Sequence, residues 1–259
     1  MNSKIRNSII QKFSMVGYQC LENTRQTLWL VNSKRNLEIR YDMRKYPCIH
    51  GKISHIRELR CNIIIRYGYH SVECFSMRDF KALHIEDDVL VYNDQEHFEQ
   101  AILEFTERLL TDGIPILDEL VSSLVYVEEN FYERLSQEPE KQAKEFAICH
   151  SLEMNGTLDN QVLAEEWLRQ QKKSNDGASL FIDRIDEFIG FAAYAGELLL
   201  AKYQSGCWAW WPQSPGEEIR TFGLFFPKED DGYDILSAMI RFWNFADYFH
   251  SDGLFLESI

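Results

Sequence analysis

The sequence predicts an α+β protein in which an N-terminal antiparallel sheet with flanking helices precedes a mostly helical unit with a small β pair. Segments that read as strands gather before residue 93, whereas apolar residues at helical spacing dominate after residue 94. Strands that precede the helices, rather than alternate with them, are typical of segregated α+β folds. We therefore expect an α+β domain over 1–120 and a mostly helical domain over 121–259, built around a central helix at 178–203.

The first domain opens with a helix over residues 3–16, where apolar residues recur at steps of three and four. Strands are expected wherever apolar and polar residues alternate or β-branched and aromatic residues gather. These segments lie at 27–31, 37–43, 62–67, 72–77 and 89–92. Residues 44–61, which contain Pro47 and Gly51, predict a long loop or an irregular excursion.

Helical spacing returns at Asp94, a typical N-cap residue, and we expect this helix to end at Gly113. The next helix opens with Pro115, which suits a first helical turn. Further helices are predicted at about 138–153, 158–173, 178–203 and 233–250, and the β pair at 207–211 and 219–226. Gly196 belongs to a small-residue face of the 178–203 helix, so we expect another element to pack closely there.

The bulk composition describes a chain that can bury a core, since 45% of its 259 residues are hydrophobic. No apolar run reaches the roughly 18 residues that span a bilayer. Polar residues interrupt the N-terminus where a signal peptide needs an apolar core. The six cysteines are scattered and match no disulfide framework. We therefore expect a cytoplasmic protein with reduced thiols and no membrane association.

Charge is distributed unevenly along the chain. Residues 1–93 hold 15 Lys and Arg against 9 Asp and Glu, a net charge of +6. Residues 94–259 hold 12 against 32, a net charge of −20. An acidic surface repels nucleic acid and attracts basic proteins. We expect a protein partner with a basic face and no nucleic acid, although the acidity also suits a surface that only maintains solubility. The oligomeric state stays open.

Two acidic groups are the candidate protein-binding residues. Asp183, Asp186 and Glu187 fall at i, i+3 and i+4 of the long helix and share one face. The second group is an expected exposed loop, Glu229-Asp230-Asp231. Carboxylates on the 178–203 helix also suit a metal- or carboxylate-dependent enzyme, which is the alternative function. Acidic residues near a helix N-terminus are favoured by the helix dipole as well.

Two other groups of residues have the composition of a site. Cys48, His50, His55 and Cys61 are zinc-type ligands, but their spacing matches no zinc module, so we predict no metal. Trp208, Trp210 and Trp211 fall in one short strand, where Trp208 and Trp210 share a face. The pattern leaves open whether these rings are core or a binding platform. No common catalytic or nucleotide-binding motif occurs, so no catalytic residue and no cofactor is predicted.

The segment from Phe188 to Glu197 contains Tyr194-x-Gly196-Glu197 and precedes Gly206-Cys-Trp208. It resembles a bacterial family of unknown function in which a Tyr-x-Gly-Glu helix precedes a Gly-x-Trp strand. Residues 1–110 look like a second uncharacterised bacterial domain, with a helix, a Gly-Tyr pair, antiparallel strands and a closing helix. Both are similar to proteins found near secreted-toxin loci, where many act as immunity proteins. The resemblance implies a non-enzymatic immunity protein that neutralises a toxin, and it transfers no catalytic residue.

Overall fold

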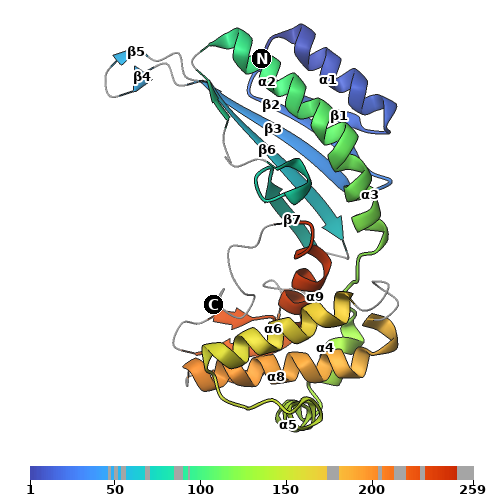
Figure 1. The fold of residues 1–259 in the computed structure, drawn as a ribbon, viewed down its shortest axis with the longest axis vertical. Helices are drawn as coiled ribbons and strands as arrows, with labels where there is room; N and C mark the ends of the chain where they lie inside the picture. The colour runs from blue at the N-terminus through green and yellow to red at the C-terminus, as the bar shows by residue number, and fades with distance from the viewer. Residues whose placement is uncertain are drawn as a thin grey trace. The chain divides into compact units, whose positions relative to one another are not determined.

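A computed structural model describes residues 1–45, 48–49, 52–53, 57–67, 71–84, 90–92, 94–173, 181–203, 206–212, 220–227 and 231–249. The fold is α+β, with an antiparallel sheet in the N-terminal part and mainly helices with a small sheet after it, as predicted (Figure 1). The chain forms two compact units. Among the described residues, unit 1 comprises 1–124 with 247–249, and unit 2 comprises 125–246.

Unit 1 is built on an antiparallel sheet in the order β1-β2-β3-β6-β7, with β8 also paired to β6. Its strands are β1 (Gln19–Asn23), β2 (Thr27–Asn32), β3 (Leu37–Lys45), β6 (Arg57–Tyr67), β7 (Ser71–Ser76) and β8 (Leu90–Tyr92). The register places Ile39 opposite Ile63 and Ile63 opposite Phe75, so apolar residues of neighbouring strands line one face. Strand β1 was not predicted. The predicted loop over 44–61 is wrong in part, because it contains the hairpin β4 (Cys48–Ile49) and β5 (Lys52–Ile53) and the start of β6.

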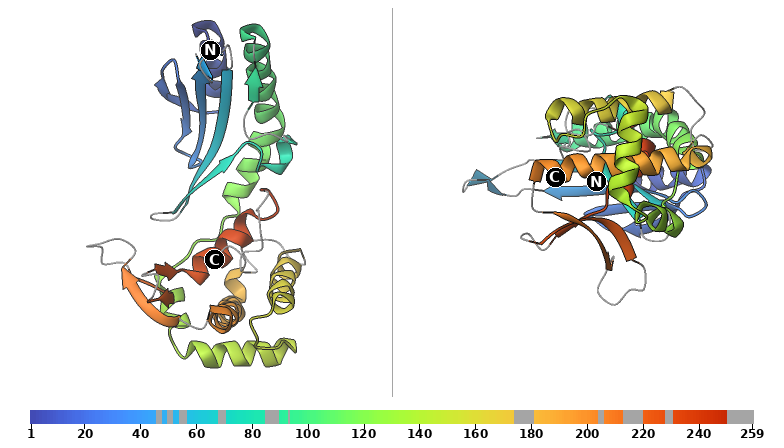
Figure 2. Two further views of the ribbon diagram at one scale, coloured as in Figure 1. Left: turned by 90° about the vertical axis from the view of Figure 1, so that its left-hand side faces the viewer. Right: turned by 90° about the horizontal axis from the view of Figure 1, so that it is seen from below.

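Helices α1 (Ser3–Met15) and α2 (Gln95–Arg108) cover the apolar face of this sheet (Figure 2). Ile9 and Phe13 of α1 and Phe98 of α2 are fully or almost fully buried there. Asp94 caps α2 as predicted, because its carboxylate accepts the main-chain N–H groups of residues 96 and 97 at 2.6 and 3.1 Å. The first helix and the Asp94 cap were both predicted from local sequence patterns, and the structure confirms them.

The prediction that Gly113 ends this helix is wrong. A π-helical turn, Leu109–Gly113, joins α2 directly to α3 (Ile114–Ser122). A Cβ on Gly113 would lie 2.8 Å from Cδ1 of Leu109 and 3.1 Å from the ring of Phe80. The glycine therefore serves close packing and not chain reversal.

The segment 247–249 returns to unit 1 from the far end of the sequence. The carbonyl of Tyr248 accepts a hydrogen bond from the main-chain N–H of Lys81 at 3.0 Å. The ring of Phe249 stacks on Phe75 with the centroids 3.7 Å apart, and on Phe80. Nothing in the local sequence anticipates this return.

Unit 2 is organised around α8 (Ile185–Tyr203), as the small-residue pattern predicts. Helix α8 contacts α4 (Glu129–Leu135), α5 (Pro139–His150), α6 (Leu158–Lys173), α9 (Ile235–Phe245) and strand β10 (Arg220–Phe226). All residues from Phe188 to Gly196 are buried. A helix that is buried on all sides lies at the centre of its unit.

Four features of unit 2 differ from the prediction. Residues 181–183 are helical, but a turn at Arg184 separates them from α8. The β pair is a three-stranded sheet, because β11 (Asp231–Tyr233) adds to β10 on the side opposite β9 (Cys207–Pro212). Helix α9 consequently starts at Ile235 and not at Tyr233, with Asp234 as its N-cap. Helix α4 was not predicted. It begins at Glu129, after α3 has ended at Ser122.

Candidate functional site

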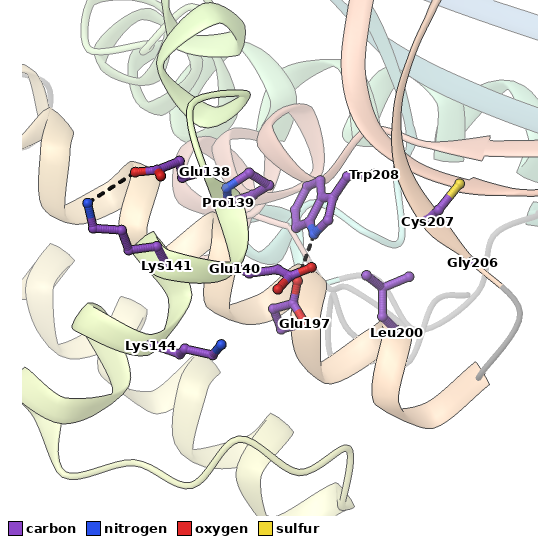
Figure 3. A pocket seen from close by; sticks show the side chains of 10 residues that line it. All are labelled: Glu138, Pro139, Glu140, Lys141, Lys144, Glu197, Leu200, Gly206, Cys207 and Trp208. Carbon is purple, nitrogen blue, oxygen red and sulfur yellow. Dashed lines mark hydrogen bonds and ion pairs between the residues drawn. The ribbon is translucent and has the colours of Figure 1, made fainter.

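A pocket of about 730 Å³ lies in unit 2, where the start of α5 faces α8 and β9 (Figure 3). Its volume falls within the range of about 300–1,000 Å³ typical of ligand pockets. The lining combines carboxylates, ammonium groups, a thiol, an indole and two aliphatic side chains. These residues are Glu138, Pro139, Glu140, Lys141, Lys144, Glu197, Leu200, Gly206, Cys207 and Trp208. We take this pocket as the candidate site, because it brings an aromatic wall and charged groups of both signs together.

Trp208 forms the aromatic wall and is fixed in place from three sides. A Cβ on Gly196 would lie 2.5 Å from Cζ2 of Trp208 and closer still to Cη2, so only glycine admits the ring there. Phe222 of β10 stacks on the indole, with centroids 5.5 Å apart and planes at 9°. The indole N–H donates a hydrogen bond to Oε1 of Glu197 at 2.7 Å. Glu197 and Trp208 therefore hold each other in one orientation.

The start of α5 supplies most of the charged groups. Glu138 precedes the helix in a left-handed conformation, with φ of 60°, and Pro139 occupies the first turn. The ammonium group of Lys141 pairs with Oε2 of Glu138 at 3.0 Å, and this hydrogen bond raises the pKa of Lys141. Within the described part of the chain, no ion pair joins Glu140, Lys144 or Glu197 to another side chain. Two carboxylates and one ammonium group thus remain uncompensated around the pocket.

The predicted acidic residues of the long helix lie elsewhere and separate from one another. Asp186 is 83% exposed and pairs with Arg134 of α4. Glu187 accepts a hydrogen bond from Nε of Arg184 at 2.6 Å and lies 3.2 Å from Nε2 of His150 on α5. These two carboxylates face different cations and do not converge on a shared ion.

The other predicted residues lie at exposed positions or outside the described ranges. Asp183 is exposed just before α8 begins. Asp231 is exposed at the start of β11, where its carboxylate accepts the main-chain N–H of Gly232 at 2.8 Å. Glu229 and Asp230 lie outside the residues that the structure describes.

The zinc-type cluster is described only in part. Cys61 lies in the buried core of unit 1, and burial raises the pKa of its thiol well above the ordinary value, which disfavours the thiolate that binds zinc. The side chain of Cys48, and His50 and His55, are outside the described residues. Elsewhere among the described residues, no group of three or more His, Cys, Asp and Glu side chains could hold a metal ion.

Strand β9, which carries Trp208, Trp210 and Trp211, contains both packed and exposed indole rings. Trp208 and Trp210 share one face, as expected, because both rings pack against Phe222. Trp210 nevertheless stays 41% exposed. Trp211 lies on the other face, where a Cβ on Gly232 would be 2.7 Å from its ring.

Sequence reasoning missed Glu138, Glu140 and Lys144 as members of a site. The Glu138-Pro139-Glu140 run reads only as a helix start, and about seventy residues separate it from Trp208. The Gly196-Glu197 and Gly206-x-Trp208 segments were both noticed, but their contact across the pocket becomes visible only in three dimensions.

No protein-family model, curated protein or solved structure matches this chain. The similarity of the Tyr194-x-Gly196-Glu197 segment to families near toxin loci therefore stays a prediction. Among the helices of the described residues, none combines the length and the apolar character needed to cross a membrane.

Proposed function

We propose that this chain is a non-enzymatic protein-binding module whose acidic unit 2 recognises a partner protein with a basic face. An immunity protein that occludes a bacterial toxin is the most concrete form of the proposal. That form rests on the resemblance of the Tyr194-x-Gly196-Glu197 segment and of residues 1–110 to domains found near toxin loci.

The observation that carries the proposal is the outward placement of the acidic side chains. Residues 125–246 hold 21 Asp and Glu against 11 Lys and Arg, a net charge of −10. Asp183, Asp186 and Asp231 are exposed, and Glu138 and Glu140 are exposed at the pocket. Carboxylates that face solvent accelerate the encounter with a basic partner, because long-range attraction acts before contact.

The alternative enzyme would need carboxylates that converge on a substrate or an ion. Asp186 and Glu187 instead turn toward Arg134 and Arg184. This divergence favours a binding role for the acidic face of α8 over acid–base or metal chemistry.

The test begins with affinity capture of a partner from the source organism, followed by purification of that partner. Its association rate with this chain is then measured by stopped flow from about 0.01 M to about 1 M salt, over which the screening length falls from about 30 Å to about 3 Å. We expect a basic partner whose association slows at least about tenfold over this range.

A matched pair of variants locates the acidic surface. Asp183→Lys/Asp231→Lys reverses two exposed charges on unit 2, and Glu104→Lys/Asp112→Lys makes the same change in net charge on exposed positions of unit 1. The first variant should slow association more than the second. Equal effects, or an association rate that ignores salt, would return the acidity to a role in solubility alone.

A further inference from the structure

The carboxylate of Glu197 is oriented but has no counter-ion among the described residues. Its Oε1 accepts the indole N–H of Trp208 at 2.7 Å, and both side chains are half-buried in the pocket lining. Glu140 lines the same pocket, and of the two lysines there Lys141 pairs with Glu138, whereas Lys144 forms no ion pair with a described residue (Figure 3). The lining therefore carries three carboxylates against two ammonium groups, a net charge of −1.

The same chain holds a second tryptophan–glutamate pair, in unit 1, that is completed by arginine. The indole N–H of Trp29 donates to Oε2 of Glu38 at 2.9 Å, and Nε of Arg66 binds the other oxygen, Oε1. The guanidinium carbon of Arg40 lies 5.8 Å from the centre of the Trp29 ring. In unit 1, arginine thus completes a group of indole, carboxylate and guanidinium. Glu197 and Trp208 supply only the indole and the carboxylate of such a group.

We infer that the pocket formed by α5, α8 and β9 receives a guanidinium group, supplied by an arginine side chain on the basic face of the partner. This inference rests on the proposed function and names the chemical group that the pocket selects. The guanidinium pairs with Glu197 and packs against the indole of Trp208, as arginines do around Glu38 and Trp29.

An anion suits this pocket less well, although it lies at a helix N-terminus. The positive end of α5 already faces the carboxylates of Glu138 and Glu140, and Glu138 neutralises Lys141 at 3.0 Å. Lys144 alone would then oppose the combined repulsion of Glu140 and Glu197. Positive charge is the complement that this lining favours.

A guanidinium fits better than the ammonium group of lysine. It is planar and weakly hydrated, so it stacks on an indole and binds a carboxylate through two N–H groups. Leu200 adds an apolar wall against which the aliphatic stem of arginine can pack. The expected order of affinity is arginine above lysine, and both above a neutral isostere.

The experiment uses the full chain and a defined probe, N-acetyl-arginine methylamide, at constant ionic strength. Its neutral isostere, N-acetyl-citrulline methylamide, is the control. Binding is followed through the indole N–H resonances in NMR spectra, with that of Trp208 assigned from Trp208→Phe. We expect the Trp208 resonance to move saturably with a dissociation constant on the order of 1–10 mM. The Trp29 resonance should stay in place, because arginine already completes its pair.

Two variants sharpen the result. Glu197→Gln keeps an acceptor for the indole but loses the charge, and should weaken the arginine probe about tenfold. Lys144→Gln removes the opposing ammonium group, and should tighten binding about twofold to fivefold. A Trp208 resonance that does not move overturns the inference. So does a shift as large with the citrulline probe, or arginine binding as tight to Glu197→Gln as to the unaltered chain.

Failure of this inference can be told from failure of the proposed function. A flat NMR titration alongside salt-dependent association of the partner would remove the guanidinium site and leave the binding module in place. Association of the unaltered chain that ignores salt, or that is slowed no more by Asp183→Lys/Asp231→Lys than by Glu104→Lys/Asp112→Lys, would remove the proposed function and with it the source of the arginine.

Discussion

Replacing Gly196 by alanine probes the closest contact between α8 and the pocket wall. The added Cβ would lie 2.5 Å from Cζ2 of Trp208, so the ring must move. Trp208 has little freedom to do so, because Phe222 stacks on it and its indole N–H is bonded to Glu197 at 2.7 Å. A single methyl group therefore disturbs packing and a charge-assisted hydrogen bond together.

The magnitude follows from three opposing contributions. Alanine in a helix interior is favoured over glycine by about 1 kcal/mol. Overpacking costs about 1–3 kcal/mol, and loss of a hydrogen bond to a charged group costs about 1.5–3 kcal/mol. These contributions sum to a predicted loss of about 1.5–5 kcal/mol in the free energy of unfolding of unit 2 for Gly196→Ala. Gly196→Leu, which adds more volume at the same point, should lower it by more than about 2 kcal/mol.

Gly190 provides a matched control on the same helix. A Cβ there would lie 3.5 Å from Cβ and Cδ2 of Phe146, an ordinary contact distance. Gly190→Ala should therefore stabilise unit 2 by up to about 1 kcal/mol, through helix propensity and the lower entropy of the unfolded chain. The two variants are predicted to change stability in opposite directions.

Urea unfolding followed by tryptophan fluorescence measures both variants. All six tryptophans except Trp29 lie in unit 2, so the signal reports mainly on that unit. Gly196→Ala that is as stable as the parent chain, or more stable, would refute the close packing of α8 on Trp208. Destabilisation by Gly190→Ala would refute the reasoning from contact distances.

Three further predictions address other parts of the molecule. Asn244→Ala should lower the stability of unit 2 by about 2–4 kcal/mol in urea unfolding, because the buried side chain accepts the N–H of Val125 at 2.9 Å and donates to its carbonyl at 2.8 Å; a change below about 1 kcal/mol would contradict this. Burial, and then the charge of Glu153, raise the pKa of Tyr194 to about 12, so its contribution to stability is present below pH 10 and is lost as the pH rises toward 12. Tyr194→Phe should consequently flatten the loss of stability in this window, and an unchanged slope would contradict the assignment. Elemental analysis should show no stoichiometric zinc, and one zinc per chain would restore residues 48–61 as a metal site.

The strands of unit 1 were predictable because one face of the sheet is buried and the other is polar. Alternation along 37–43 matches the burial of Leu37, Ile39 and Tyr41 against the core helices. Strand β1 carries no such signal, since its side chains are largely exposed. An edge strand held by main-chain hydrogen bonds leaves little trace in the pattern of its residues.

The errors at Gly113 and β11 have a common cause. Glycine is a stop signal when only local geometry is considered, yet at Gly113 the absence of a side chain makes room for Leu109 and Phe80. Tyr233 continues a helical pattern, yet it lies on β11 and pairs with Leu224 of the neighbouring strand β10. In both places packing or strand pairing in the folded structure overrides a local preference.

The candidate site shows the same limit of local reasoning in sharper form. Glu197 and Trp208 each stood out in the sequence, one beside a helix glycine and one in a tryptophan-rich strand. Their bond to each other, and the approach of Glu138 and Glu140 from α5, depend on how α8, β9 and α5 pack. Spacing along the chain carries no information about that meeting.

The two tryptophan–glutamate pairs suggest why one carries its arginine within the chain and the other does not. Glu38 is only 4% exposed, and a carboxylate so deeply buried would destabilise the fold unless the chain itself supplied a counter-ion, which is Arg66. Glu197 is half-buried at the edge of an open pocket, where water screens its charge and the cost of leaving it without a cation is small. Stability therefore demands an internal arginine beside Glu38 but not beside Glu197. A carboxylate held in a fixed orientation by an indole and accessible from outside can then accept its cation from another molecule. The two pairs are chemically equivalent but differ in burial. This difference supports a structural role for Glu38 and Trp29, and the recognition role proposed above for Glu197 and Trp208.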